Sequence, residues 1–217
     1  EKYRGLAPMY YRGAVAAIVV YDITSKASFS TLKNWITELQ QLGPSNLVIC
    51  IAGNKCELSD QREVTPEEAV RRARLAGVER IVTICTRLDR YELVREIAVQ
   101  FDDVYMGVGV HPHEAGDAGI DRPDALIDMA AADPKMVGVG ETGLDYFYDF
   151  APKAQQRTSF EAHILAARHL ALPLIIHTRD ADDDTISILR EHWQDGAFPI
   201  LIHCFTGGQA LADAVAP

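Results

Sequence analysis

The sequence lacks the features that would direct it to a membrane or to a bare nucleic-acid backbone. No apolar run in the 217 residues reaches the roughly 18 residues that a membrane helix requires. The formal net charge is -10, so no basic excess is present to attract phosphates over a distance. A nuclease is still allowed, because bound divalent cations supply local positive charge. The first residues also lack the pattern of a signal peptide, and we expect a cytoplasmic protein with no membrane partner.

Cysteine pairs and flexible linkers are missing too. The four cysteines show no C-x-x-C spacing and lie mostly within apolar runs, so we expect buried, reduced thiols at Cys50, Cys56, Cys85 and Cys204. The chain has no low-complexity tract, no fixed repeat and no linker rich in glycine or serine. A domain boundary, if one exists, must therefore lie inside a regular element.

Short apolar runs alternate with longer stretches of helical period. The runs end near Asp22, Gly53, Cys85, Val110, Gly140, Ile176 and Ile202. Helices are predicted over 28–42, 65–76, 89–101, 123–132, 151–171 and 183–193, and Thr65-Pro66-Glu67-Glu68 is typical of a capped helix start. This alternation predicts the α/β class, with about seven mostly parallel strands that form a partial (β/α) barrel or an open sheet.

Residues 1–69 resemble the second half of a Rab-type small GTPase of the early-endosomal branch. The similarity lies in EKYRGLAPMYYRGA at 1–14, in AIVVYDIT at 17–24 and in NKCE at 54–57. The resemblance implies a remnant of the guanine-reading loop at Asn54, Lys55 and Glu57.

The resemblance does not extend to a working nucleotide site. The chain contains no G-x-x-x-x-G-K-[ST] to cradle phosphates. Glu57 stands where the family has an aspartate, and its extra methylene shifts the paired hydrogen bonds to guanine. We therefore expect neither GTP binding nor Rab-type effector binding, and we read the loop as a polar turn after a buried strand.

Residues 70–217 resemble TatD-type deoxyribonucleases, which are metal-dependent hydrolases built on (β/α)8 barrels. Four motifs carry the similarity in order: VGVHPHE at 108–114, GETGLDY at 140–146, HTRDAD at 177–182 and HCFTGG at 203–208. The resemblance implies a two-metal phosphodiesterase in which Glu141 serves both ions, while His177 and His203 each ligate one. Its substrate would be DNA or another phosphodiester.

The order of residues supports the same site independently. Barrel enzymes place their chemistry at the carboxyl ends of strands, and Glu141, His177 and His203 each follow an apolar run. Two imidazoles and a carboxylate are a known catalytic zinc set that leaves a position for water. We therefore expect a weakly bound divalent metal (Zn, Mn or Mg) at these residues, with Glu141 as the catalytic group.

Five further polar residues are candidates to orient ligands or to bind substrate. His111 follows a strand, and His113 and Asp145 are candidates to orient metal ligands. Arg179 and Asp180 follow a ligand and are expected to contact phosphate or to pair with each other, with the ion pair preferred. The helical histidines His163, His169 and His192 are expected at the surface.

Parts of the family pattern are missing, and this leads us to expect weak or no activity. The resemblance implies a first strand with H-x-H and a later strand with a metal-binding aspartate, and neither is present: the only H-x-H is 111–113. We place the join at 69/70, between a fragment without a P-loop and a barrel fragment that lacks its first strand and last two strands. The alternatives are a Rab-like fragment that binds protein without GTPase activity, and a non-functional fusion.

The join also makes a structural prediction. A single helix would continue across it, with Val70, Ala73 and the stretch 75–77 on one apolar face. The strand ending near Gly53 would then pair beside the strand ending at Cys85. Lys55 would reach the rim of the metal site, where it would pair with Glu141.

Overall fold

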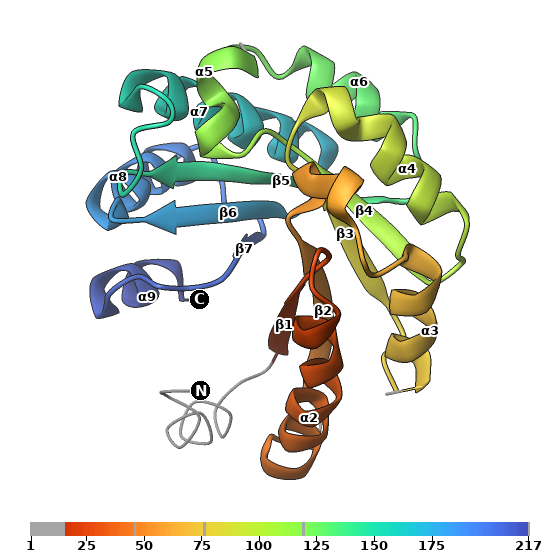
Figure 1. Cartoon of the computed structure of the whole chain (residues 1–217). Coiled ribbons are helices and arrows are strands. Elements are labelled where there is room, and N and C mark those ends of the chain that lie inside the picture. The colour runs from red at the N-terminus through yellow and green to blue at the C-terminus, as the bar shows by residue number, and fades with distance from the viewer. Residues whose placement is uncertain (1–15, 46, 76, 119, 217) are drawn as a thin grey trace. The chain divides into compact units, whose positions relative to one another are not determined.

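The computed structural model describes residues 16–45, 47–75, 77–118 and 120–216 (Figure 1). The chain divides into two compact units, Glu1–Thr83 and Ile84–Pro217. Seven strands lie within the described residues, and helices alternate with them. The predicted α/β class is therefore confirmed, but the strands form one sheet of two and another of five.

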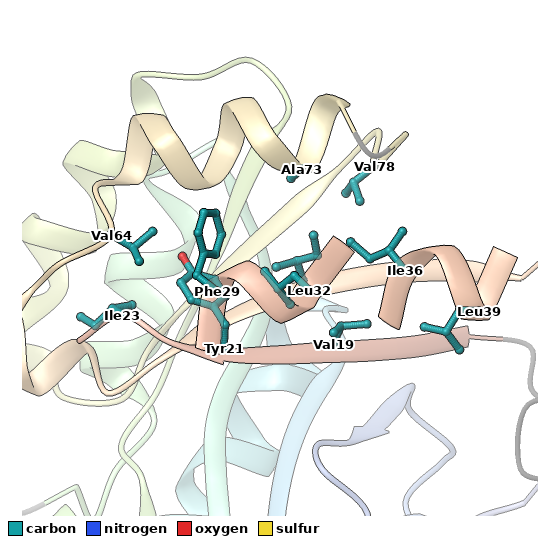
Figure 2. Packing of buried hydrophobic residues seen from close by; sticks show 11 residues of the cluster. Val19, Tyr21, Ile23, Phe29, Leu32, Ile36, Leu39, Val64, Ala73 and Val78 are labelled. Carbon is teal, nitrogen blue, oxygen red and sulfur yellow. The ribbon is translucent and has the colours of Figure 1, made fainter. Parts of the chain in front are cut away.

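The first unit contains a small parallel sheet with helices beside it. Its elements are β1 (Ala16–Asp22), α2 (Lys26–Leu42), β2 (Val48–Asn54), a 3-10 segment (Cys56–Gln61) and α3 (Pro66–Leu75). Figure 2 shows the core of this unit, in which side chains of β1, α2 and α3 meet. The buried members include Val19, Tyr21, Phe29, Leu32, Ile36 and Ala73.

The start of α3 follows its sequence closely. The Thr65 hydroxyl accepts a hydrogen bond from the backbone N–H of Glu68 at 3.2 Å, which confirms the predicted cap. Val70 and Ala73 are buried as predicted. Leu75 is 76% exposed, so the predicted apolar face ends before it.

The second sheet runs in chain order, β3-β4-β5-β6-β7. Its strands are β3 (Ile81–Cys85), β4 (Val104–Val108), β5 (Met136–Asp145), β6 (Leu174–Arg179) and β7 (Ile200–Ile202). Between and after them lie α4 (Tyr91–Val99), α5 (Ala115–Ala118), α6 (Asp124–Ala131), α7 (Lys153–Leu170), α8 (Asp182–Trp193) and α9 (Gln209–Val215), with 3-10 segments at Leu88–Arg90 and Pro112–Glu114. The pairs from β4 to β7 are parallel, as expected when helices connect successive strands.

Strand β5 is longer than the sequence suggested, since it continues past Gly140 to Asp145. Its pairing with β6 shifts register between Val139 and Thr142, so Glu141 lies at an irregularity inside the strand. Gly143 has φ +134°, and a Cβ there would lie 2.0 Å from the backbone oxygen of His177. Glycine is therefore required where β5 passes the next strand.

One prediction about the join is wrong. Strand β2 pairs with β1 and not with β3, and β2 and β3 belong to different sheets. The ammonium of Lys55 lies 2.6 Å from the Asp22 carboxylate within the first unit. The pairing of Lys55 with Glu141 stays a prediction. The side chains of Asn54 and Glu57 lie outside the described part of the structure.

Several smaller expectations can also be settled. Cys85 is buried as predicted, Cys204 is exposed and corrects the expectation, and the side chains of Cys50 and Cys56 fall outside the described part. No helix in the described ranges is long and apolar enough to cross a membrane. The join at 69/70 stays a prediction, because the division at Thr83 reflects compactness rather than sequence origin.

Candidate metal centre

Three imidazoles surround one buried carboxylate in the second unit. Glu141 Oε1 lies 2.9 Å from His203 Nδ1, 3.3 Å from His177 Nδ1 and 3.9 Å from His111 Nε2. Glu141 is 8% exposed, so this carboxylate is largely shielded from bulk water. The structure thus brings together the three residues predicted as ligands and adds His111 to them.

The main chain of each histidine is held by the backbone of a neighbouring strand or loop. The backbone N–H of His111 donates to Thr86 O at 2.9 Å, beyond the end of β4, and the backbone N–H of His203 donates to Ile176 O at 2.7 Å, beyond the end of β7. His177 lies within β6, where it is paired with Gly143 of β5. The parallel sheet therefore directs four polar residues to one end of its strands, as in barrel enzymes.

The electrostatics favour an ionised carboxylate among imidazoles. Burial alone would raise the pKa of Glu141, but hydrogen bonds from His177 and His203 outweigh it and hold the pKa well below its usual range. Burial lowers the pKa of His111 to about 3, so this ring is neutral. The hydrogen bond with Glu141 raises the pKa of His203.

Asp145 forms the outer part of the site. Its Oδ2 accepts from His113 Nε2 at 2.8 Å and from His177 Nε2 at 2.9 Å. Its Oδ1 accepts from the backbone N–H groups of Phe147 and Tyr148 at 3.0 and 3.1 Å. Nε2 of His177 faces Asp145 while Nδ1 faces Glu141 at 3.3 Å, and a histidine whose second ring nitrogen is held by a carboxylate is typical of metal sites. The predicted roles of His113 and Asp145 as orienting groups stay predictions, and these contacts are consistent with them.

The buried His163 was placed at the surface by sequence, and this prediction is wrong. It is 0% exposed on α7, where Nδ1 donates to Ser159 O at 2.6 Å and Nε2 accepts from the N–H of Val110 at 2.9 Å. Burial lowers its pKa to about 4. Phe160 and Ala167 are buried three residues before and four residues after it on the same helix face, and this spacing could have revealed the burial. His163 fixes the chain just before His111. His169 is exposed and His192 is half-buried.

The prediction of an ion pair between Arg179 and Asp180 is also wrong. The guanidinium of Arg179 lies 3.8 Å from the ring centre of Phe147, and no ion pair between the two residues occurs in the described structure. Asp180 is exposed, with φ +52° at the end of β6. Arg179 consequently keeps its charge available beside the site.

The donor set fits a divalent cation. Donor atoms of His111, Glu141 and His177 all lie within 4.8 Å of one another. His203 joins through Glu141, and its buried Nε2 has no hydrogen-bond partner within the described residues. Imidazole nitrogens around a carboxylate are the ligands that zinc prefers and that manganese accepts. Glu141 is common to both groups of donors, so its carboxylate faces His111 as well as His203.

Two family profiles match the chain. The family described as TatD related DNase matches residues 54–216, and the Ras family matches residues 1–91. The two matches overlap around α3 and β3, where the sequence resemblances also change over.

Individual relatives divide in the same way. Human Rab-22A is 64% identical over 69 residues, which are 32% of this chain and 36% of that protein. The "uncharacterized metal-dependent hydrolase YabD" of Bacillus subtilis (strain 168) is 37% identical over 156 residues, which are 71% of this chain and 60% of that protein. The crystal structure of YJJV, a TatD homolog from Escherichia coli K12, superposes with a TM-score of 0.58 at 25% identity and covers 68% of this chain and 57% of that one. The chain thus spans less than two thirds of each relative. It belongs to the TatD related DNase family, with a Ras-family segment as its first part.

Proposed function

We propose that the second unit binds a divalent cation through Glu141, His177 and His203, and acts as a TatD-type phosphodiesterase of low activity. The observation that carries the proposal is the contact of one buried carboxylate oxygen with three imidazole nitrogens. Buried charge is costly unless it is paired, and a cation among these donors would satisfy both the carboxylate and the lone pairs.

The protein groups would hold the site ready for hydrolysis. Asp145 keeps the His177 ring in one orientation, and His163 fixes the chain before His111. When bound, the ion would supply a Lewis acid and lower the pKa of a water molecule toward neutrality. Arg179 lies beside the site with a charge suited to a phosphate oxygen. The substrate would be a phosphodiester, with DNA as the first candidate.

We expect low activity because of the sequence that precedes β3. The segment β1 to α3 carries Ras-type sequence, and its described strands contribute no histidine to the second sheet. A site with fewer ligands holds metal less tightly and leaves more positions to water. Weak, metal-dependent hydrolysis is therefore expected in place of full family activity.

Calorimetric titration with zinc and with manganese tests the ligand set. We expect weak saturable binding to the parent chain, and loss of most of the affinity in His177→Ala and in His203→Ala. His169→Ala removes an exposed histidine of the same unit and should change nothing. Unchanged titrations for His177→Ala and His203→Ala would show that the assignment is wrong.

A second measurement tests the reaction. Hydrolysis of a small activated phosphodiester should depend on added manganese and should fall with His177→Ala in parallel with metal affinity. Metal binding without any metal-dependent hydrolysis would reduce the proposal to a cation site.

A further inference from the structure

A cavity opens between α2 and α3, and all the residues that line it belong to the first unit. Its volume is about 490 Å³, within the range of roughly 300 to 1,000 Å³ that is usual for small-molecule sites. Four buried side chains form the bottom of the cavity, which we call the apolar floor: Phe29, Leu32, Ile36 and Ile51. None of them takes part in the proposed hydrolysis, so the cavity is a separate candidate site.

Small side chains on α3 leave this space open. Ala69 and Ala73 lie one helical turn apart, on the face of α3 that packs against the core of the first unit. Figure 2 shows Phe29 directed from α2 toward α3, with Ala73 on the facing side. Two methyl groups fill little of the roughly 8 to 10 Å between the axes of packed helices, so a space remains beside the core.

Cationic side chains surround the apolar floor. Lys33, Arg71 and Arg72 line the cavity and are exposed, and we call them the cationic rim. No carboxylate is among the described residues that line the cavity, although the chain as a whole carries a net charge of -10. The local charge is thus opposite to that of the whole chain, and it favours an anion.

Two members of the cationic rim have charges available to a ligand. The Arg72 guanidinium pairs with Glu68 Oε1 at 3.2 Å and lies 5.4 Å from the ring centre of Phe29. Lys33 and Arg71 form no ion pair with any other residue that the structure describes. Leu75, which also lines the cavity, is 76% exposed and adds apolar surface beside these cations.

We propose that this cavity binds a small amphipathic anion, a medium-chain fatty carboxylate, with its alkyl chain on the apolar floor and its carboxylate on the cationic rim. The apolar floor would bury methylene groups, and the cationic rim would pair with the head group. A protein partner would need a much larger surface, roughly 800 Å² on each side of a stable interface. The proposal goes beyond the hydrolytic function and involves neither metal nor phosphodiester.

Calorimetric titration of the full chain with decanoate tests the inference, in metal-free buffer and below the concentration at which micelles form. We expect saturable binding that strengthens by up to about fourfold for each methylene added between octanoate and decanoate. Decanol has the same chain without the charge, and should bind about tenfold more weakly than decanoate.

Variants of the cationic rim locate the site. Lys33→Gln combined with Arg71→Gln should weaken decanoate binding about tenfold, because both unpaired cations of the cationic rim are removed. Arg80→Gln removes an exposed cation of the same unit that does not line the cavity, and should bind decanoate as the parent does.

The inference is overturned if decanoate shows no saturable binding, if decanol binds as tightly, or if the double variant binds decanoate as the parent does. An equal loss in Arg80→Gln would also overturn it, because net charge would then account for the binding. Binding of an acidic amphipathic peptide without binding of decanoate would assign the cavity to a protein partner instead.

Discussion

The two units differ in the groups that contact the carboxylates of their parallel strands. In the first unit, Asp22 at the end of β1 meets Lys55 after β2, and this contact lowers the pKa of the carboxyl to about 2. In the second unit, Glu141 meets imidazoles, whose ring nitrogens can serve as metal ligands. The carboxylate of the first unit is already paired with an ammonium, whereas the second set offers several donor atoms to a cation.

This difference explains why similar architecture does not imply similar chemistry. Both units place polar groups after buried parallel strands, the position at which α/β proteins bind ligands. The ammonium of a lysine occupies the carboxylate oxygens that a cation would otherwise contact. A protonated ammonium has no lone pair, so it cannot itself bind a cation. Function is therefore read from the donor set rather than from the strand end.

The largest expected effect separates the two carboxylates. Glu141→Gln keeps the size of the side chain but removes its charge, so saturable zinc binding should disappear. Asp22→Asn is the matched change in the first unit and should leave the zinc titration as in the parent. Equal losses in both variants would abolish the distinction between the units.

The next effect concerns pH and His163. Its pKa is about 4 in the folded chain, below the ordinary value of 6.5 for histidine, so folding excludes a proton that the unfolded chain accepts. The stability that the neutral, buried His163 contributes is fully present above pH 6.5 and is lost as the pH falls toward 4. At about 1.4 kcal/mol per pKa unit, it amounts to about 3 kcal/mol.

Urea denaturation between pH 7 and pH 4 measures this contribution. His163→Gln should lower stability at pH 7 and should flatten the pH dependence of the second unit, whereas exposed His169→Gln should do neither. A parent slope that persists in His163→Gln would assign the acid sensitivity to other groups.

A smaller effect is expected at the outer carboxylate. Asp145→Asn leaves an acceptor oxygen for only part of the contacts with His113 and His177, so zinc affinity should fall by about 10- to 100-fold. Calorimetry gives the value directly. A loss as complete as that of Glu141→Gln would place Asp145 among the ligands instead.

No effect is expected for guanine nucleotides. A fluorescent GDP or GTP analogue should give no saturable signal at micromolar protein, and Asn54→Ala should not change the trace. Saturable binding that Asn54→Ala removes would restore a nucleotide function to the first unit.

The sequence predicted the elements well because their signals are local. Apolar runs bounded by polar residues marked the strands, and the Thr65 cap was recovered in the structure. The pairing of β2 was not predicted correctly, because a right-handed crossover allows a strand to pair on either side and the choice depends on tertiary packing.

The site shows the same division. Glu141, His177 and His203 were predicted as ligands from motifs at strand ends, and the structure brings their side chains together. The sequence did not reveal that Asp145 accepts hydrogen bonds from both His113 and His177, since partners 32 residues apart leave no local pattern. His163 was missed because a polar residue on an apolar helix face was assigned by its type rather than by its position.

X-ray absorption at the zinc edge of the zinc-loaded chain tests the central claim most directly. The account predicts a nitrogen and oxygen shell at about 2.0 to 2.1 Å with scattering from about two imidazoles, and loss of one imidazole in His177→Ala. A sulfur shell near 2.3 Å, or an oxygen-only shell that is the same in His177→Ala, would contradict it.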